Sequence, residues 1–503
     1  MTNNDNKVAI NAPGTSGMTV QATAFNWING VQTSDGKLKP SIDPATYDII
    51  GYYPENGIAA AKAAVAAASK AFKETTWAYD HELRAHVLNQ LAAAFECNRD
   101  RLIEILSLEN GKVKGEAAFE IDMIPSKLRY SAATVLMENG RAVTPKPGSL
   151  SVILKQPMGV AGIIAPWNSP AVLTIRSLAP ALAAGCTAVI KLPAQIAQTA
   201  SVMAEIMAEA EDLPNGVINL FFENGPEGSA YLVESPDVPA ISFTGSTGTG
   251  RAIGAVGAKR MKRFGMELGG KTPMILFDDA DIDSALPVIE KALTVFSGQF
   301  CMTGSRLLVQ DGIFERVRDT LAQQLDDVKV GPASDPSSDM GPLIDRENVL
   351  RVDQVVKNAI AEGAHVVVRG GPVSVGPLSK GAFFRPALLE ITDNSLSILQ
   401  EETFGPVLTI QRFRDEAEAI QLANDSEFGL AASIWTRDID RSLKLAQALE
   451  AGTVWVNDWA KVYDNTEEGG FKQSGLGRLN GLAALDDFIE YKHIALKPGL
   501  HRG

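Results

Sequence analysis

The chain has 503 residues, of which 45% are hydrophobic and 21% charged, and its formal net charge at pH 7 is −14. This length predicts a globular protein of roughly two to four domains of about 150 residues each. The negative charge argues against nucleic acid or an anionic membrane surface as a partner. The polar residues 1–7 lack the apolar core of a signal peptide, and no apolar run reaches the ~20 residues of a membrane span. We therefore expect a cytoplasmic protein.

Hydrophobic patterns alternate along the chain between helical and strand-like periods. The first series has expected helices over 56–72, 81–109 and 199–211, and buried strands over 160–165, 188–191, 217–222 and 240–243. The second has strands over 274–277, 306–309, 365–368, 407–413 and 453–457, with helices such as 313–325 between them. This alternation predicts an α/β fold with a parallel sheet under residues 155–265 and two domains that part near Glu267.

Two segments depart from this pattern. Residues 142–156 contain Pro145-Lys146-Pro147-Gly148 between extended runs, which predicts a protruding hairpin. Residues 487–496 form a strand-like end with alternating charge. The two segments either pair at a subunit interface or remain a solvated hairpin and a frayed tail.

The most informative residue is Cys301, which follows Glu267 by about thirty positions, each among glycines. A thiolate attacks a carbonyl, and a nearby carboxylate activates water against the resulting thioester, so the pair suggests covalent catalysis. The alternative is a buried packing thiol, which is our interpretation of Cys186; Cys97 is expected in a helix. These three cysteines match no zinc motif, and the five histidines lie outside every motif, so no metal site is expected.

Two further motifs have a functional and a structural interpretation. The stretch Thr244-Gly245-Ser246-Thr247-Gly248-Thr249-Gly250 follows a strand and fits neither a P-loop nor the usual dinucleotide fingerprint, so it is either a pyrophosphate site or a turn. Asn168 follows the strand 160–165 in Pro166-Trp167-Asn168. Its amide either donates to an oxyanion or serves as an Asx-turn or helix N-cap group.

Taken together, seven motifs resemble the aldehyde dehydrogenase superfamily from about residue 28 to residue 492. In chain order they are Pro166-Trp167-Asn168, Lys191, Phe243-Thr244-Gly245-Ser246, Glu267-Leu268-Gly269-Gly270-Lys271, Gly298-Gln299-Phe300-Cys301, Glu402-Thr403-Phe404-Gly405-Pro406 and Gly469-Gly470-Phe471-Lys472.

The resemblance implies oxidation of an aldehyde to a carboxylic acid with NAD+ or NADP+. Cys301 would form the thiohemiacetal and thioester, Asn168 would bind the oxyanion, and Glu267 would activate water. The implied cofactor contacts are Trp167, Lys191, Ala194, Gly245, Ser246, Glu402 and Phe404.

The resemblance also implies an atypical Rossmann cofactor domain over 1–133 and 154–265 and a catalytic domain over 266–472. Segments 134–153 and 483–503 would form an oligomerisation element, which indicates a homodimer or homotetramer. The small-molecule partner would be the aldehyde.

Three positions depart from the family pattern. Ala194 stands where NAD-preferring relatives usually have a Glu that grips the ribose 2′-hydroxyl, which leaves NAD+ and NADP+ both open; family frequency favours NAD+, and Gln195 offers a replacement hydrogen bond. Ser177 and Leu479 replace a Lys and a Glu assigned to proton release. We therefore expect Glu267 to exchange protons by another route, through Glu467 or Glu468.

The family positions predict a substrate tunnel lined by Leu173, Arg176, Val295, Phe300, Met302, Trp459 and Val462. Arg176 either binds a substrate carboxylate or turns outward into a surface ion pair. Val295 replaces the second Arg of succinic semialdehyde enzymes, which disfavours a short dicarboxylic semialdehyde. We therefore expect a polar, aromatic or carboxylated aldehyde, and a larger polar, hydroxylated or aromatic one fits Arg176, Phe300 and Trp459 better. A CoA-acylating enzyme normally lacks the base, and a non-catalytic protein of this fold would not need Cys301, Glu267 and Asn168 together.

Overall fold

The structure is a computed structural model that describes residues 22–137 and 140–496. The polar start at 1–7 and the last part of the predicted oligomerisation element, 497–503, lie outside the described residues. Within the described ranges, no helix is long and apolar enough to cross a membrane.

The larger of two main sheets has eight strands. In spatial order they are β24 (Gly475–Leu476), β12 (Arg263–Glu267), β11 (Ala240–Thr244), β8 (Val160–Ile164), β9 (Thr187–Pro193), β10 (Ile218–Glu223), β2 (Asn26–Ile28) and β3 (Val31–Thr33). Strands β8 to β12 run parallel, whereas β24, β2 and β3 pair antiparallel with their neighbours. The parallel sheet predicted under residues 155–265 is therefore confirmed.

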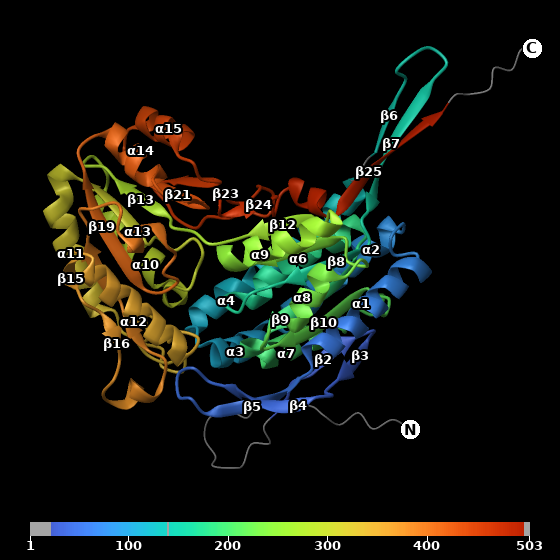
Figure 1. Cartoon of the computed structure of the whole chain (residues 1–503), viewed down its shortest axis with the longest axis horizontal. Coiled ribbons are helices and arrows are strands. Elements are labelled where there is room, and N and C mark those ends of the chain that lie inside the picture. The colour runs from blue at the N-terminus through green and yellow to red at the C-terminus, as the bar shows by residue number, and fades with distance from the viewer. Residues whose placement is uncertain (1–21, 138–139, 497–503) are drawn as a thin grey trace, which may run out of the picture.

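Helices cover both faces of this sheet, because its central strands are apolar on both sides (Figure 1). Ile164 packs with the cluster of α1 (Gly57–Glu74), α8 (Glu227–Glu234) and α9 (Thr247–Gly257). Ile163 packs on the opposite face. The helices of that face are α2 (His81–Cys97), α3 (Arg99–Asn110), α4 (Lys114–Asp122), α5 (Ile124–Met137), α6 (Pro170–Ala184) and α7 (Ala197–Met207). Each fully buried Ile contributes about 2–3 kcal/mol to folding.

The single helix predicted over 81–109 is wrong, because the chain breaks at Asn98 into α2 and α3. The Asn98 side chain donates to the carbonyl of Ala94 at 3.0 Å and to the Glu209 carboxylate. A short amide side chain can hydrogen-bond nearby backbone carbonyls and so compete with the backbone hydrogen bonds of a helix. Hydrophobic periodicity does not reveal such a break.

The second main sheet has seven strands. Their order is β15 (His365–Val368), β18 (Ala387–Glu390), β19 (Val407–Phe413), β14 (Arg306–Gln310), β13 (Pro273–Leu276), β21 (Ala431–Trp435) and β22 (Thr453–Val456). It also lies between helix layers, which comprise α10 (Ile282–Thr294), α11 (Phe314–Asp327), α12 (Arg346–Ala361), α14 (Glu416–Asn424) and α15 (Ile439–Ala448). The predicted second α/β series is thus present, while the proposed domain boundaries stay predictions.

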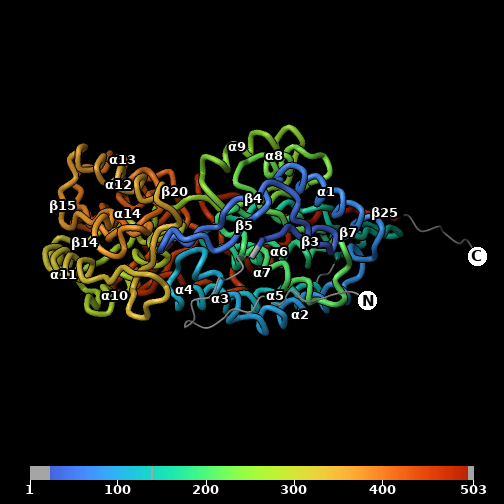
Figure 2. Tube along the Cα trace, turned by 90° about the horizontal axis from the view of Figure 1, so that it is seen from below, coloured from blue at the N-terminus to red at the C-terminus, as the bar shows by residue number. Residues whose placement is uncertain are grey.

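An arm of three antiparallel strands projects from the body (Figure 1). It contains β6 (Arg141–Val143), β7 (Leu150–Pro157) and β25 (Ile489–Leu496), with Leu496 opposite Leu150. In Figure 2 the arm lies at the end of the molecule remote from α11 and β15. The predicted hairpin is confirmed, and the C-terminal strand pairs with it inside one chain.

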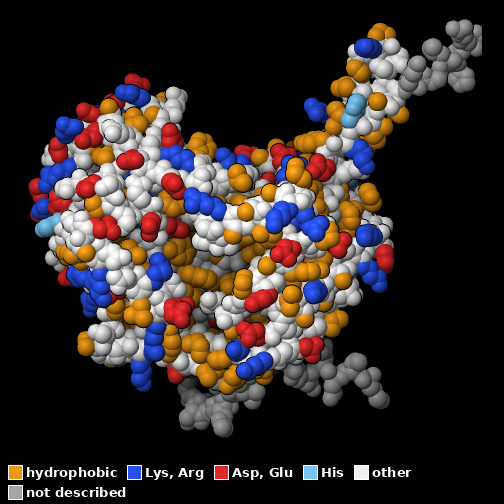
Figure 3. All heavy atoms as spheres, in the orientation of Figure 1, with side chains coloured by type: hydrophobic (Ala, Val, Ile, Leu, Met, Phe, Trp, Pro, Cys, Tyr) orange, Lys and Arg blue, Asp and Glu red, His pale blue; other side chains and the backbone are white. Residues whose placement is uncertain are grey.

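The smaller elements form three short sheets and one short helix. They are β1 (Ala22–Thr23), β4 (Lys37–Ile42), β5 (Ile49–Glu55), β16 (Gly371–Pro372), β17 (Phe384–Arg385), β20 (Phe428–Gly429), β23 (Phe471–Lys472) and α13 (Ser397–Gln400). After β22 the chain returns to the larger sheet, where β24 pairs with β12 and sets Gly475 opposite Glu267. The surface is hollowed between the two main parts, and hydrophobic side chains gather there (Figure 3).

Candidate active site

Cys301 lies at the end of a tight turn after α10. Phe296, Ser297 and Gly298 have φ angles of 51°, 58° and 72°, all in the left-handed region. Each such non-glycine residue costs on the order of 1–3 kcal/mol, and such strain concentrates at functional sites. A Cβ on Gly298 would meet the carbonyl carbon of Gly405 at 2.4 Å. Glycine is therefore required for this turn to pack against the Gly405 segment.

The loop that follows Glu267 touches the Cys301 backbone. Strand β12 ends at Glu267, and a Cβ on Gly270 would lie 2.3 Å from the carbonyl oxygen of Cys301. The amide of Gly270 donates to Glu402 Oε1 at 3.1 Å. Three segments distant in sequence therefore converge, and the thiol, Glu267 and Glu402 lie close enough for their charges to interact.

Asn168 reaches the same turn from the larger sheet. Its Nδ2 donates to the carbonyl of Gln299 at 2.9 Å, and the side chain is buried. Ser169, not Asn168, is the N-cap residue of α6, so the helix-cap alternative for Asn168 is wrong. A primary amide has two N–H groups, and the second remains for another acceptor.

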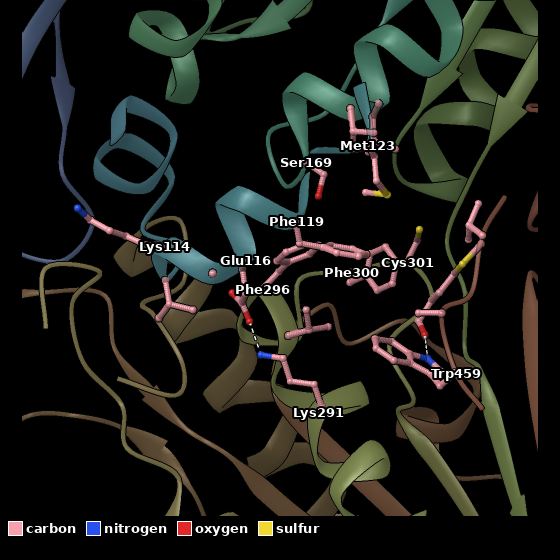
Figure 4. Close-up of a pocket in the computed structure, with 18 of the residues that line it drawn as sticks. Lys114, Glu116, Phe119, Met123, Ser169, Lys291, Phe296, Phe300, Cys301 and Trp459 are labelled. Carbon is pink, nitrogen blue, oxygen red and sulfur yellow. Dashed lines mark hydrogen bonds and ion pairs between the residues drawn. The ribbon is translucent and has the colours of Figure 1, made fainter. Parts of the chain in front are cut away.

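A cavity of about 1130 Å³ leads to Cys301. All the predicted tunnel residues line it, namely Leu173, Arg176, Val295, Phe300, Met302, Trp459 and Val462. Sequence reasoning missed the contribution of α4, which supplies Lys114, Glu116 and Phe119 (Figure 4). No motif marks α4; the one signal that its sequence offers is an aromatic residue, Phe119, in a short helix rich in charged residues.

The cavity wall next to Cys301 is aromatic. The Phe300 ring packs edge-on against Phe296 at 5.6 Å and against Trp459 at 5.9 Å between centroids. Trp459 Nε1 donates to the carbonyl of Met302 at 2.9 Å, which fixes the indole (Figure 4). The wall is thus a rigid apolar surface, and the N–H of its Trp459 indole already has a hydrogen-bond acceptor.

Arg176 points into the protein, so the outward surface pair considered for it is wrong. Its Nη1 lies 3.0 Å from Glu468 Oε1, and the two side chains are 5% and 8% exposed. Both residues line the cavity. Of the two glutamates considered for proton exchange, Glu468 therefore faces the site, whereas Glu467 is exposed and accepts from the amide of Leu482.

Burial sets the protonation of the reacting groups. It raises the pKa of Glu267 to about 8, although the Arg176 charge opposes the shift, and Glu267 Oε1 has no hydrogen-bond partner among the described residues. Burial also raises the pKa of the Cys301 thiol to about 12, again against Arg176. The resting thiol is therefore neutral, and a nearby base must remove its proton when it attacks.

The model of the aldehyde dehydrogenase family matches residues 31–494. The chain belongs to the aldehyde dehydrogenase family. It is 35% identical to the betaine aldehyde dehydrogenase of Bacillus subtilis strain 168, over 91% of this chain and 94% of that protein. It is also 35% identical to the succinate-semialdehyde dehydrogenase [NADP(+)] of Escherichia coli K12, over 93% and 97%.

A solved structure of betaine aldehyde dehydrogenase from Staphylococcus aureus, in complex with NAD+, superposes with a TM-score of 0.92. It is 34% identical, and the match covers 95% of this chain and 96% of that one. The fold predicted from the motifs is confirmed, and the chain is an aldehyde dehydrogenase, an NAD(P)-dependent oxidoreductase.

The dinucleotide residues expected in this aldehyde dehydrogenase lie toward the carboxyl ends of the parallel strands β11 and β9, which pair with β8 on its two sides. Ser246 caps α9, accepting from the amide of Thr249 at 3.3 Å, and Gly245 donates to the carbonyl of Glu267 at 3.0 Å. Lys191 lies near the end of β9, where burial lowers its pKa. Its ammonium has no hydrogen-bond partner in the part of the chain that the structure describes. A helix N-terminus and an unengaged ammonium fit a pyrophosphate and a ribose.

A second group of expected cofactor contacts lies beside the catalytic turn. The Trp167 and Phe404 rings pack edge-on at 5.5 Å. Phe404 has a φ of 48°, and burial raises the pKa of Glu402 to about 7. Ala194 is fully buried and offers no polar group. Trp167, Glu402 and Phe404 fit a nicotinamide riboside near Cys301, whereas Ala194 directly follows β9, near Lys191, and is the position that departs from the family pattern.

Proposed function

We propose that this dehydrogenase oxidises its aldehyde through a covalent bond to Cys301. As Cys301 Sγ attacks the carbonyl carbon, the thiol proton passes to Glu267 and the oxyanion accepts from the Asn168 amide. The nicotinamide supplies the hydride acceptor, which leaves a thioester on Cys301. Glu267 then releases the thiol proton to solvent and, as a carboxylate again, takes a proton from the water that adds to the thioester carbonyl. The C–S bond breaks, the Cys301 thiolate takes up the proton from Glu267, and the acid leaves.

The observation that carries this proposal is the contact between Gly270 and the Cys301 carbonyl. It brings a buried carboxylate that titrates near neutrality beside a thiol that needs a base. The test is reduced-nicotinamide absorbance with a panel of aldehydes, with and without CoA. Turnover without CoA supports hydrolysis; acyl-CoA formation in place of the free acid would refute it.

For the cofactor, we propose a preference for NAD+. Glu223 ends β10 beside Pro193, its carboxylate is buried, and its charge acts on Lys191. The Glu223 carboxylate would repel the negative charge of a ribose 2′-phosphate, even though the usual carboxylate is absent at Ala194. Equal kcat/KM for NAD+ and NADP+ would contradict this preference.

For the substrate, we propose a neutral aldehyde with an aromatic or bulky apolar group. Phe296, Phe300 and Trp459 offer ring edges and faces next to Cys301. The charge of Arg176, a buried cation of the cavity wall, is balanced by Glu468. We expect benzaldehyde and phenylacetaldehyde to give higher kcat/KM than succinate semialdehyde or betaine aldehyde; the reverse order would refute this substrate class.

We also propose that the arm joins copies of the chain into a homodimer or homotetramer. Its strands expose apolar side chains, including Val143, Leu154, Ile494 and Leu496. Such a patch on a projecting arm is typical of an interface. Light scattering should give a multiple of the 53.6 kDa chain mass, and Ile494→Glu should lower it. A monomeric wild-type protein would contradict the proposal.

A further inference from the structure

Glu468 is held in one orientation by its backbone. It forms an isolated antiparallel bridge with Leu479, in which each amide donates to the other residue's carbonyl at 2.7 Å. Its side chain points inward to the cavity, whereas that of the preceding Glu467 lies at the surface. The chain thus directs one of two consecutive carboxylates toward the reaction site.

Both carboxylate oxygens of Glu468 are engaged. Oε1 accepts from Arg176 Nη1 at 3.0 Å, and Oε2 accepts from Asn480 Nδ2 at 2.9 Å. Asn480 is oriented in turn by Lys127, whose Nζ donates to Asn480 Oδ1 at 3.1 Å and to Asp464 Oδ1 at 2.9 Å. Hydrogen bonds to both oxygens fix the position of the Glu468 carboxylate.

Arg176 keeps binding capacity that the protein does not fill. Its Nη2 donates weakly to Thr244 Oγ1 at 3.4 Å, and its Nε has no partner among the described residues. A guanidinium in an apolar cavity is a strong site for a carboxylate, because charge-assisted hydrogen bonds are favourable away from water. In this chain Glu468 supplies the carboxylate that Arg176 binds.

We propose that Glu468 is a specificity residue: as a built-in carboxylate it occupies the face of Arg176 that a substrate carboxylate would otherwise bind, and so excludes carboxylated aldehydes. The inference rests on the proposed function, since it concerns the substrate of the Cys301 reaction. A substrate carboxylate entering the cavity would meet a neutralised Arg176 and the negative charge of Glu468. It would lose its own hydration with no uncompensated positive charge to replace it, although Arg176 keeps unfilled N–H groups.

The test compares Glu468→Gln with the wild-type enzyme on two aldehydes, succinate semialdehyde and benzaldehyde. Glutamine keeps the shape and one acceptor but removes the charge, so Arg176 gains a free positive charge. We expect the ratio of kcat/KM for succinate semialdehyde over benzaldehyde to rise by roughly tenfold or more, the usual worth of a hydrogen bond to a charged group. Succinate should also become a competitive inhibitor.

Two variants separate this role from a structural one. Glu467→Gln removes the neighbouring exposed carboxylate and should leave the selectivity ratio unchanged. The double variant Arg176→Met, Glu468→Gln should not show the increased kcat/KM ratio, because it lacks the guanidinium that would bind the substrate carboxylate. If Glu468→Gln kept its turnover of benzaldehyde with an unchanged ratio, the inference would be overturned; a gain that survived Arg176→Met would also overturn it.

Failure of the inference differs from failure of the proposed function. If wild-type enzyme already preferred succinate semialdehyde, the proposed substrate class would be wrong. If wild type turned over benzaldehyde but Glu468→Gln gained no selectivity, the reaction would stand and the role of Glu468 alone would fall. Succinate inhibition provides a second readout that does not depend on turnover of the variant.

Discussion

Cys186 is a buried thiol and Cys301 a partly exposed one at the cavity, and burial raises the pKa of each, to about 11 and about 12. Cys186 lies among apolar residues and donates its S–H to the carbonyl of Phe488 at 3.3 Å. Cys301 opens on a cavity and feels the charges of Arg176 and Glu267. A raised thiol pKa therefore does not distinguish a packing cysteine from a nucleophile; the base and the cavity beside it do.

Loss of the thiol beside the base should have the largest effect. We expect Cys301→Ser to lower kcat by roughly a thousandfold or more, as removal of a nucleophile does, because a serine hydroxyl is far harder to deprotonate. Steady-state turnover of benzaldehyde measures it. Retention of wild-type kcat would show that Cys301 is not the nucleophile and that the two cysteines do not differ in function.

The pH dependence of turnover should be the next largest effect. Burial holds the pKa of Glu267 at about 8, so the fraction in the carboxylate form, which is the active base, increases as pH rises through this value. When hydrolysis limits turnover, kcat should increase about tenfold between pH 7 and pH 9. A kcat that was flat across this range would show that Glu267 is not the limiting base.

The smallest effect is expected at the packing cysteine. Cys186→Ala removes one sulfur atom and a weak hydrogen bond, so it should reduce the free energy of unfolding by about 1 kcal/mol. Urea denaturation measures this loss. The kcat for benzaldehyde should stay at the wild-type value, and a large fall in kcat would contradict the assignment of Cys186 to packing.

Much of the fold could be predicted because its strands are short and apolar on both faces. Residues 160–165 and 240–243 show this pattern, and both strands are confirmed. The break at Asn98 was not predicted, because it depends on a side-chain hydrogen bond, and the hydrophobic pattern continues through it. The partner of the C-terminal strand also needed the structure, since register depends on the three-dimensional position of both strands.

Motifs predicted which residues form the site, but they did not predict its ion pairs. Cys301, Glu267 and the tunnel residues follow from positions in known motifs, and the structure brings them together. The Arg176–Glu468 pair could not be predicted, because it joins residues 292 positions apart on separate elements. The wall contributed by α4 carries no motif, so only packing reveals it.

The most direct test of the account is single-turnover and steady-state kinetics of Glu267→Gln with benzaldehyde and NAD+ at high pH. At high pH, hydroxide can take the Cys301 proton in place of the missing carboxylate, so thioester formation should survive while hydrolysis slows. We predict a burst of about one equivalent of reduced nicotinamide per Cys301, followed by turnover slower by roughly a hundredfold. Linear turnover at the wild-type rate, with no burst, would contradict the account.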